Sequence, residues 1–98
     1  MKIAHEIKEL EGFAGKAKLY KVDPPMEWTS YKENKERIFL TTHVVVSATN
    51  VMFTGPETYI FPSNEKGKIT DWGEIDGSYR GGLSLTKALK NAGYEVTT

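Results

Sequence analysis

The residues best suited to acid–base chemistry near neutral pH are the two histidines, His5 and His43, because histidine is the side chain whose ordinary pKa lies in that range. Neither histidine lies in a recognisable catalytic motif. His43 falls on the less apolar side of an alternating stretch, so we expect a half-exposed structural residue there. A small hydrolase or metal enzyme that pairs His43 with Asp71 or Glu74 is therefore the least favoured of three functional hypotheses.

Other catalytic and metal-binding motifs are missing from the sequence. The chain has no cysteine, which excludes disulfides and the usual thiolate zinc sites. The acidic residues Asp71, Glu74 and Asp76 do not have the spacing of a calcium-binding EF-hand loop. The glycine-rich stretch 77–82 does not match the P-loop motif, and no serine has the context of a nucleophile elbow. We predict no catalytic residue, no metal site and no cofactor.

Aromatic and arginine side chains cluster around the same turns. Trp72, Tyr79 and Arg80 are of the types that dominate protein-binding hot spots, since they combine a large apolar area with a polar group. Tyr79 and Arg80 are flanked by glycines, so we expect a surface turn that presents both side chains. These three residues are the predicted partner-binding site. The competing interpretation is a place in the core of a small domain, which the sequence favours for Trp72 and leaves as open as a surface position for Tyr79 and Arg80.

The second functional hypothesis is a small nucleic-acid-binding module. Basic residues near the aromatic residues Tyr20, Trp28 and Tyr31 motivate it, namely Lys16, Lys18, Lys21, Lys32, Lys35 and Arg37. Bases stack on aromatic rings while cations hold the phosphates. However, the chain carries 13 basic and 13 acidic residues, so no overall field attracts an anionic polymer.

The hydropathy pattern predicts two well-defined elements. The stretch from Ile38 to Ala48 alternates and is rich in β-branched residues, which is typical of a long strand with one apolar face. Near the C-terminus, Ser84 is a suitable N-cap for a short helix that ends before Gly93. The helix presents one apolar stripe, and we expect its Leu85 and Leu89 to meet Val44 and Val46 of the strand.

The N-terminal part is ambiguous between a helix and a hairpin, and we favour a hairpin whose turn is bracketed by Gly12 and Gly15. Asp23-Pro24-Pro25 should end its second strand, because proline cannot donate to a ladder. The following stretch, Met26 to Arg37, is interpreted as a polar excursion, either a solvated loop or a hairpin tip.

Turn-forming residues divide the remaining sequence. We expect a turn at Gly55-Pro56, a short strand that Pro62 ends, and a hairpin tip at 64–67 followed by an antiparallel return over 68–72. The stretch 94–96 is predicted to be a last edge strand. Together these elements predict one α+β domain over residues 1–98, with an antiparallel sheet of about five strands and one short C-terminal helix packed on one face.

Several strings of the sequence resemble a group of small bacteriophage and prophage proteins without an assigned function. They are GFAGKAKLYKVDPP, HVVVSA, GPETYIFP, ITDWGEIDGSYRGG and ALKNAGYEV, so the likeness covers Gly12–Pro25 and His43–Val96 but not the polar excursion. The resemblance implies an accessory protein in the cytoplasm of a bacterial host. It carries over no site residues.

The leading hypothesis is therefore a non-enzymatic accessory protein that binds a host or phage protein. The N-terminus has no apolar stretch of signal-peptide length, and the uncharged stretch Ile38–Pro56 is too polar for a membrane span. The sequence leaves open whether the sheet edges also pair with a second copy to form a homodimer.

Overall fold

The computed structural model describes residues 2–12, 15–30, 35–51, 55–70, 79–80 and 84–97. Its elements follow the order β1 (Ile3–Glu9), β2 (Lys16–Ser30), β3 (Arg37–Val51), β4 (Gly55–Ser63), β5 (Tyr79–Arg80), α1 (Leu85–Asn91) and β6 (Glu95–Thr97). The six strands form one sheet in the order β5-β4-β3-β2-β1-β6. All neighbours are antiparallel except β1 and β6, which are parallel. The predicted α+β class with a mostly antiparallel sheet is confirmed.

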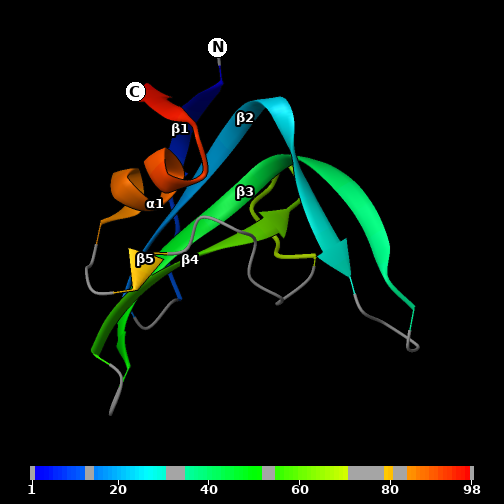
Figure 1. The fold of residues 1–98 in the computed structure, drawn as a ribbon. Helices are drawn as coiled ribbons and strands as arrows, with labels where there is room; N and C mark the ends of the chain where they lie inside the picture. The colour runs from blue at the N-terminus through cyan, green and yellow to red at the C-terminus, as the bar shows by residue number, and fades with distance from the viewer. Residues whose placement is uncertain are drawn as a thin grey trace.

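The helix α1 connects the two edges of the sheet, because it follows β5 at one edge and precedes β6 at the other. It therefore crosses one face of the sheet (Figure 1). This crossover also explains why β6 runs parallel to β1, whereas the sequence predicted only antiparallel pairs. Because every pair from β1 to β5 is antiparallel, β5 runs in the same direction as β1. A helical crossover joins strands of the same direction, so β6 runs in the direction of β5 and therefore of β1.

The helix begins and ends where its sequence predicts. The Ser84 hydroxyl oxygen accepts a hydrogen bond from the Lys87 amide over 3.2 Å, which satisfies one of the free donors of the first turn. Gly93 has a φ of +91°, the left-handed conformation that glycine adopts without a Cβ clash. The Tyr94 amide then donates to the Leu89 carbonyl oxygen at 2.9 Å, so the chain turns directly from α1 into β6.

The main core lies between α1 and the sheet. As predicted, Leu85 and Leu89 belong to the same buried cluster as Val44 and Val46. A second cluster occupies the opposite face, where Ala17, Leu19 and Val45 are fully buried and where Leu10 and Ile69 pack on them. The centre of β3 is therefore buried on both faces. The prediction of one apolar face was wrong because the chain after β4 and the end of β1 cover the second face.

The prolines after Val22 do not end β2, contrary to the prediction. The strand continues to Ser30, with a register shift between Lys21 and Met26 in its ladder with β3. Lys21 pairs with His43 and Met26 pairs with Thr41, so residues 22–25 bulge opposite a single β3 residue. Pro24 and Pro25 lie inside this bulge, where the ladder with β3 needs no amide donors from them.

The N-terminal hairpin is confirmed, since β1 pairs antiparallel with β2. Two turn predictions around β4 were wrong. Gly55-Pro56 begins the strand rather than forming a turn, and β4 continues through Pro62 to Ser63. On the side of β4 away from β3, β5 pairs only with Glu57 and Thr58, and Pro62 contributes only its carbonyl oxygen, which accepts a hydrogen bond from the Thr70 amide at 2.9 Å. A proline is tolerated at such an edge.

The hairpin tip at 64–67 is confirmed. The Asn64 side-chain oxygen accepts hydrogen bonds from the amides of Lys66 and Lys68, each 2.9 Å long, as asparagine commonly does in turns. The return that was predicted over 68–72 is reduced to one bridge between Ser63 and Ile69 in the described part. Trp72 lies outside the described residues.

Candidate functional site

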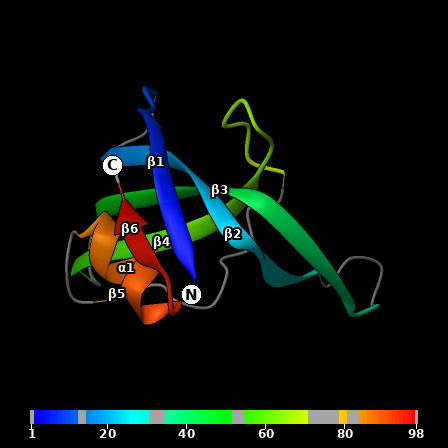
Figure 2. The same cartoon turned by 90° about the horizontal axis from the view of Figure 1, so that it is seen from above.

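The second half of β2 and the beginning of β3 form a two-stranded arm, defined here as residues 26–30 and 37–41. The two segments pair with each other along their whole length, from Met26 opposite Thr41 to Ser30 opposite Arg37. The described ladders of β1 and β4 do not reach the arm, because β1 pairs no further than Asp23 and β4 pairs only from His43 onward. Figures 1 and 2 show the arm extending away from the rest of the sheet.

The arm exposes three large apolar side chains in succession. Ile38 is 62% exposed, Phe39 is 42% exposed and Leu40 is 68% exposed. Successive strand residues point to opposite faces, so both faces of the arm are apolar. Scattered apolar side chains are normal on a protein surface, but a contiguous exposed group is typical of an interaction site.

One aromatic pair links the arm to the main core. Trp28 pairs with Phe39 across the ladder, and their rings stack with centroids 5.0 Å apart and an interplanar angle of 26°. Trp28 also packs against the core beneath α1, in which Met26 is only 5% exposed. The arm is thus anchored through Met26 and Trp28, while Ile38 and Leu40, on either side of Phe39, face solvent.

This surface was not predicted from the sequence, for two connected reasons. The composition of residues 26–37 indicated a polar excursion, whereas Met26–Ser30 and Arg37 are strand residues. The alternating pattern also placed Ile38 and Leu40 on the buried face with Val44. The proline pair before Met26 was the sequence feature that could have indicated this surface. A bulge at these prolines marks the point beyond which β3 pairs with β2 alone and its side chains are exposed.

The structure places the predicted partner-binding residues only in part. Tyr79 and Arg80 form β5 and pair with Thr58 and Glu57 of β4, so their backbone is an edge strand and not the predicted surface turn. Their side chains are not described. Trp72 and residues 71–78, which include Asp71, Glu74 and Asp76 of the metal hypothesis, lie outside the described residues.

The two histidines lie in register on either side of β2, since both His5 and His43 pair with Lys21, and each contacts a threonine hydroxyl. His43 is half-buried, as predicted, and its Nδ1 lies 2.9 Å from the Thr42 hydroxyl. His5 is exposed, and its Nδ1 lies 2.7 Å from the Thr97 hydroxyl. Within the described ranges, no group of three or more metal-ligating side chains gathers at either histidine.

The residues of the nucleic-acid hypothesis are distributed over different surfaces. Tyr20 is 1% exposed, so its ring is covered and cannot stack on a base. Lys18 makes an ion pair with Glu6 at 2.6 Å. Lys21 lies on the opposite face of β2 from Lys18, because their separation in the strand is odd. Lys32 and Tyr31 are outside the described part of the chain.

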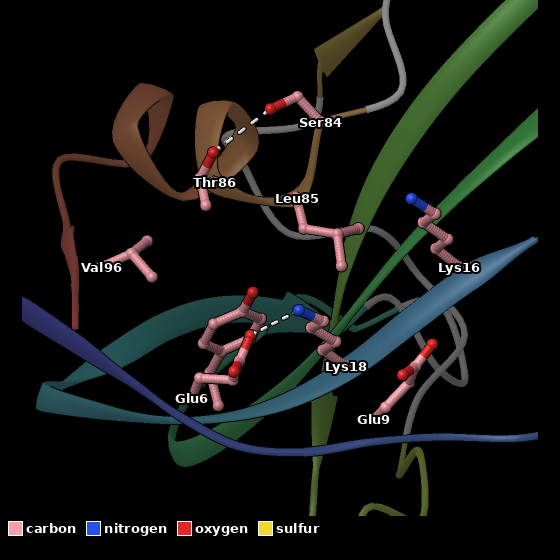
Figure 3. A pocket seen from close by; sticks show the side chains of 9 residues that line it. Glu6, Glu9, Lys16, Lys18, Ser84, Leu85, Thr86 and Val96 are labelled. Carbon is pink, nitrogen blue, oxygen red and sulfur yellow. Dashed lines mark hydrogen bonds and ion pairs between the residues drawn. The ribbon is translucent and has the colours of Figure 1, made fainter. Parts of the chain in front are cut away.

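A polar pocket of about 490 Å³ lies between the beginning of α1 and the strands β1 and β2 (Figure 3). Its lining consists of Glu6, Glu9, Lys16, Lys18, Tyr20, Ser84, Leu85, Thr86 and Val96. Burial raises the pKa of the Tyr20 phenol, and the nearby Glu6 carboxylate raises it further. The hydrogen bond to Glu6 likewise raises the pKa of the Lys18 amine. Both groups are therefore protonated near neutral pH and act as hydrogen-bond donors.

Comparison with known proteins identifies no relative: no family model matches the chain, and neither the curated proteins nor the solved structures contain a significant match. In the part of the chain that the structure describes, no helix is both long and apolar enough to cross a bilayer.

Proposed function

We propose that this protein is a non-enzymatic binding protein that engages a protein partner through the arm. The exposure of Ile38, Phe39 and Leu40 on a projecting two-stranded ribbon is the observation that carries the proposal. A two-stranded hairpin is marginally stable in water, and its open edges can accept a further strand. A partner that covers the arm would bury the apolar side chains and pair the free backbone groups.

A protein partner is favoured over nucleic acid by the chemistry of the arm. The side chains that face solvent along Ile38–Leu40 are apolar, whereas nucleic-acid binding depends mainly on cations that contact phosphates. The formal net charge of zero adds no attraction to a polyanion. The resemblance noted in the sequence extends the proposal to a phage-type accessory role in the cytoplasm of a bacterial host.

The test compares capture of bacterial proteins by the wild-type chain and by an Ile38→Ser/Leu40→Ser variant, with quantification of each captured protein. Ile7→Ser is the matched control, because Ile7 is an exposed apolar residue of β1 (47% exposed) outside the arm. Two apolar hot-spot residues together are worth about 3 kcal/mol or more, so the double variant should bind the captured partner about a hundredfold more weakly. Ile7→Ser should bind normally.

A second variant, Tyr79→Ala/Arg80→Ala, tests the site that the sequence predicted. If this variant loses the partner while Ile38→Ser/Leu40→Ser retains it, the interface is at β5 and the assignment to the arm is wrong. A steep loss of binding with added salt would instead support the nucleic-acid hypothesis. Capture of a second copy of the chain through the arm would identify the protein partner as a homodimer.

A further inference from the structure

The polar pocket contains a hydrogen-bond donor that the fold does not use. Tyr20 is 1% exposed, yet its hydroxyl makes no hydrogen bond with the residues that the structure describes. Every fully buried polar side-chain atom of those residues has a partner, so the Tyr20 hydroxyl is not fully enclosed and opens into the pocket that its side chain lines. This unused donor at the wall of the pocket is therefore available to a ligand that enters it.

The ion pair beside Tyr20 also keeps unused hydrogen-bonding capacity. Lys18 donates to Oε1 of Glu6 over 2.6 Å, as Figure 3 shows. An ammonium group has three donors and a carboxylate has two oxygens, so Lys18 keeps free donors and Glu6 keeps a free acceptor oxygen. The two side chains are 33% and 27% exposed. Their remaining groups can therefore bind a molecule that enters the pocket.

The charges of the pocket favour a neutral ligand. Two amines, Lys16 and Lys18, are balanced by two carboxylates, Glu6 and Glu9. A phosphate would be attracted to the two amines but repelled by the two carboxylates. An amine ligand would be attracted to the carboxylates but repelled by the amines. The apolar side chains of Leu85 and Val96 also line the pocket, which suits a ligand with a carbon face. A volume of about 490 Å³ is within the usual range for small-molecule sites.

We propose that this pocket binds a neutral small molecule through a vicinal diol. One hydroxyl of the diol accepts from Lys18 and its neighbour donates to Glu6, so adjacent oxygens match an adjacent cation and anion. Hydrogen bonds to charged groups are stronger than neutral ones, and the two hydroxyls reinforce each other. The Tyr20 hydroxyl donates to a third oxygen of the ligand. A free sugar and the ribose of a nucleoside both provide this chemistry.

The test is a titration of the isotope-labelled full chain, followed by the amide resonances of Lys18, Leu85 and Val96. The probes are glucose, methyl riboside and uridine at millimolar concentration, and the controls are 2′-deoxyuridine and inorganic phosphate. We expect the diol probes to shift these resonances and 2′-deoxyuridine to bind at least several-fold more weakly. Tighter binding of uridine than of methyl riboside would identify a nucleoside, and binding of glucose alone would identify a free sugar.

Tyr20→Phe isolates the role of the hydroxyl. Because this hydroxyl has no partner in the described structure, its removal should leave the melting temperature unchanged and weaken binding by about fivefold to tenfold. Tyr59→Phe is the matched control, since Tyr59 lies on β4 outside the pocket, and it should bind like the wild type. Glu6→Gln, which keeps the shape of the side chain but removes the carboxylate, should also weaken binding.

Three results would overturn the proposal. The first is that no diol shifts the resonances of the pocket. The second is that phosphate or 2′-deoxyuridine binds as well as the diols do. The third is that Tyr20→Phe and Glu6→Gln both bind like the wild type.

Discussion

Trp28 and Phe39 face each other across the β2–β3 ladder, and their rings stack 5.0 Å apart. Trp28 reaches back to the core beneath α1, while Phe39 is 42% exposed. The pair lies in the middle of the arm's ladder and therefore couples the arm to the core that α1 covers. A partner on the arm would contact a surface that is already oriented by this stack.

Phe39→Ala tests whether the stack orders the arm. An aromatic pair contributes about 1 kcal/mol beyond its buried area, and Phe39 lies outside the core clusters. We expect a loss of about 1–2 kcal/mol in the free energy of unfolding, measured by urea denaturation, and faster amide hydrogen exchange at Trp28 and Leu40. Amide hydrogen exchange at Val44 and Val46 should become faster only to the extent that the free energy of global unfolding decreases. Complete unfolding of the variant would show that the arm is part of the main core.

Gly15→Ala should be strongly destabilising. A Cβ at Gly15 would overlap the backbone carbonyl oxygen of Ala48 on β3, and a backbone atom cannot move away as a flexible side chain can. Overpacking of this kind costs about 1–3 kcal/mol or more. Gly12→Ala is the matched control in the same turn. Nothing lies within 4 Å of its Cβ position, and only its φ of +89° is unfavourable, so we expect a loss of about 1 kcal/mol. Equal melting temperatures for the two variants would contradict this packing.

Val46→Asp should prevent folding. Val46 is fully buried in the main core, and an unpaired carboxylate there costs several kcal/mol, which is comparable with the total stability of a small domain. Ile38→Asp on the same strand is the control, because Ile38 is 62% exposed, and it should retain a cooperative thermal transition. Circular dichroism during heating distinguishes the two. Cooperative melting of Val46→Asp near the wild-type temperature would mean that the buried face has been misassigned.

Alkaline pH should destabilise the fold. The pKa values of Tyr20 and Tyr94 are raised, first by burial, and that of Lys18 is raised by its hydrogen bond to Glu6. Above about pH 10, which is the ordinary range of these groups, the unfolded chain loses protons that the folded chain still holds. The free energy of unfolding should therefore be at its full value below about pH 10 and should decrease as the pH rises through the folded pKa values.

The measurement for this prediction is the urea midpoint as a function of pH in the wild type and in Tyr20→Phe. The variant lacks one of the groups that release a proton on unfolding, so its midpoint should decrease less steeply. Identical pH profiles would indicate that Tyr20 titrates alike in the folded and unfolded states.

Sequence patterns correctly predicted those helices and turns whose ends are set by residues a few positions away in the chain. The Ser84 cap, Gly93 and the apolar stripe of α1 interact within the helix or one turn from it, which is why the helix was placed correctly. The turn at 64–67 was predicted for the same reason, since Asn64 binds amides only two and four residues away. The β-branched residues of β3 were sufficient to predict a strand.

The candidate site could not be predicted in this way, because exposure depends on which strands lie beside a residue. Ile38 and Val44 look equivalent in the alternating pattern, but Val44 lies between β2 and β4 under α1 while Ile38 has only β2 beside it. The bulge at residues 22–25 determines where this change occurs. The prolines in this bulge predicted the end of a strand, because the sequence does not show that residues 22–25 are left out of the hydrogen-bonded ladder between β2 and β3.

The sequence by itself determined the α+β class, the central strand, the capped helix, the hairpins and the absence of thiol chemistry. These properties follow from residue types and from contacts between near neighbours in the chain. The tertiary structure decided the parallel pairing of β6, the burial of both faces of β3, the exposed arm and the pocket around Tyr20. Each of these depends on residues that are distant in the sequence, because the apolar surface that remains exposed is known only after α1 and six strands have been placed.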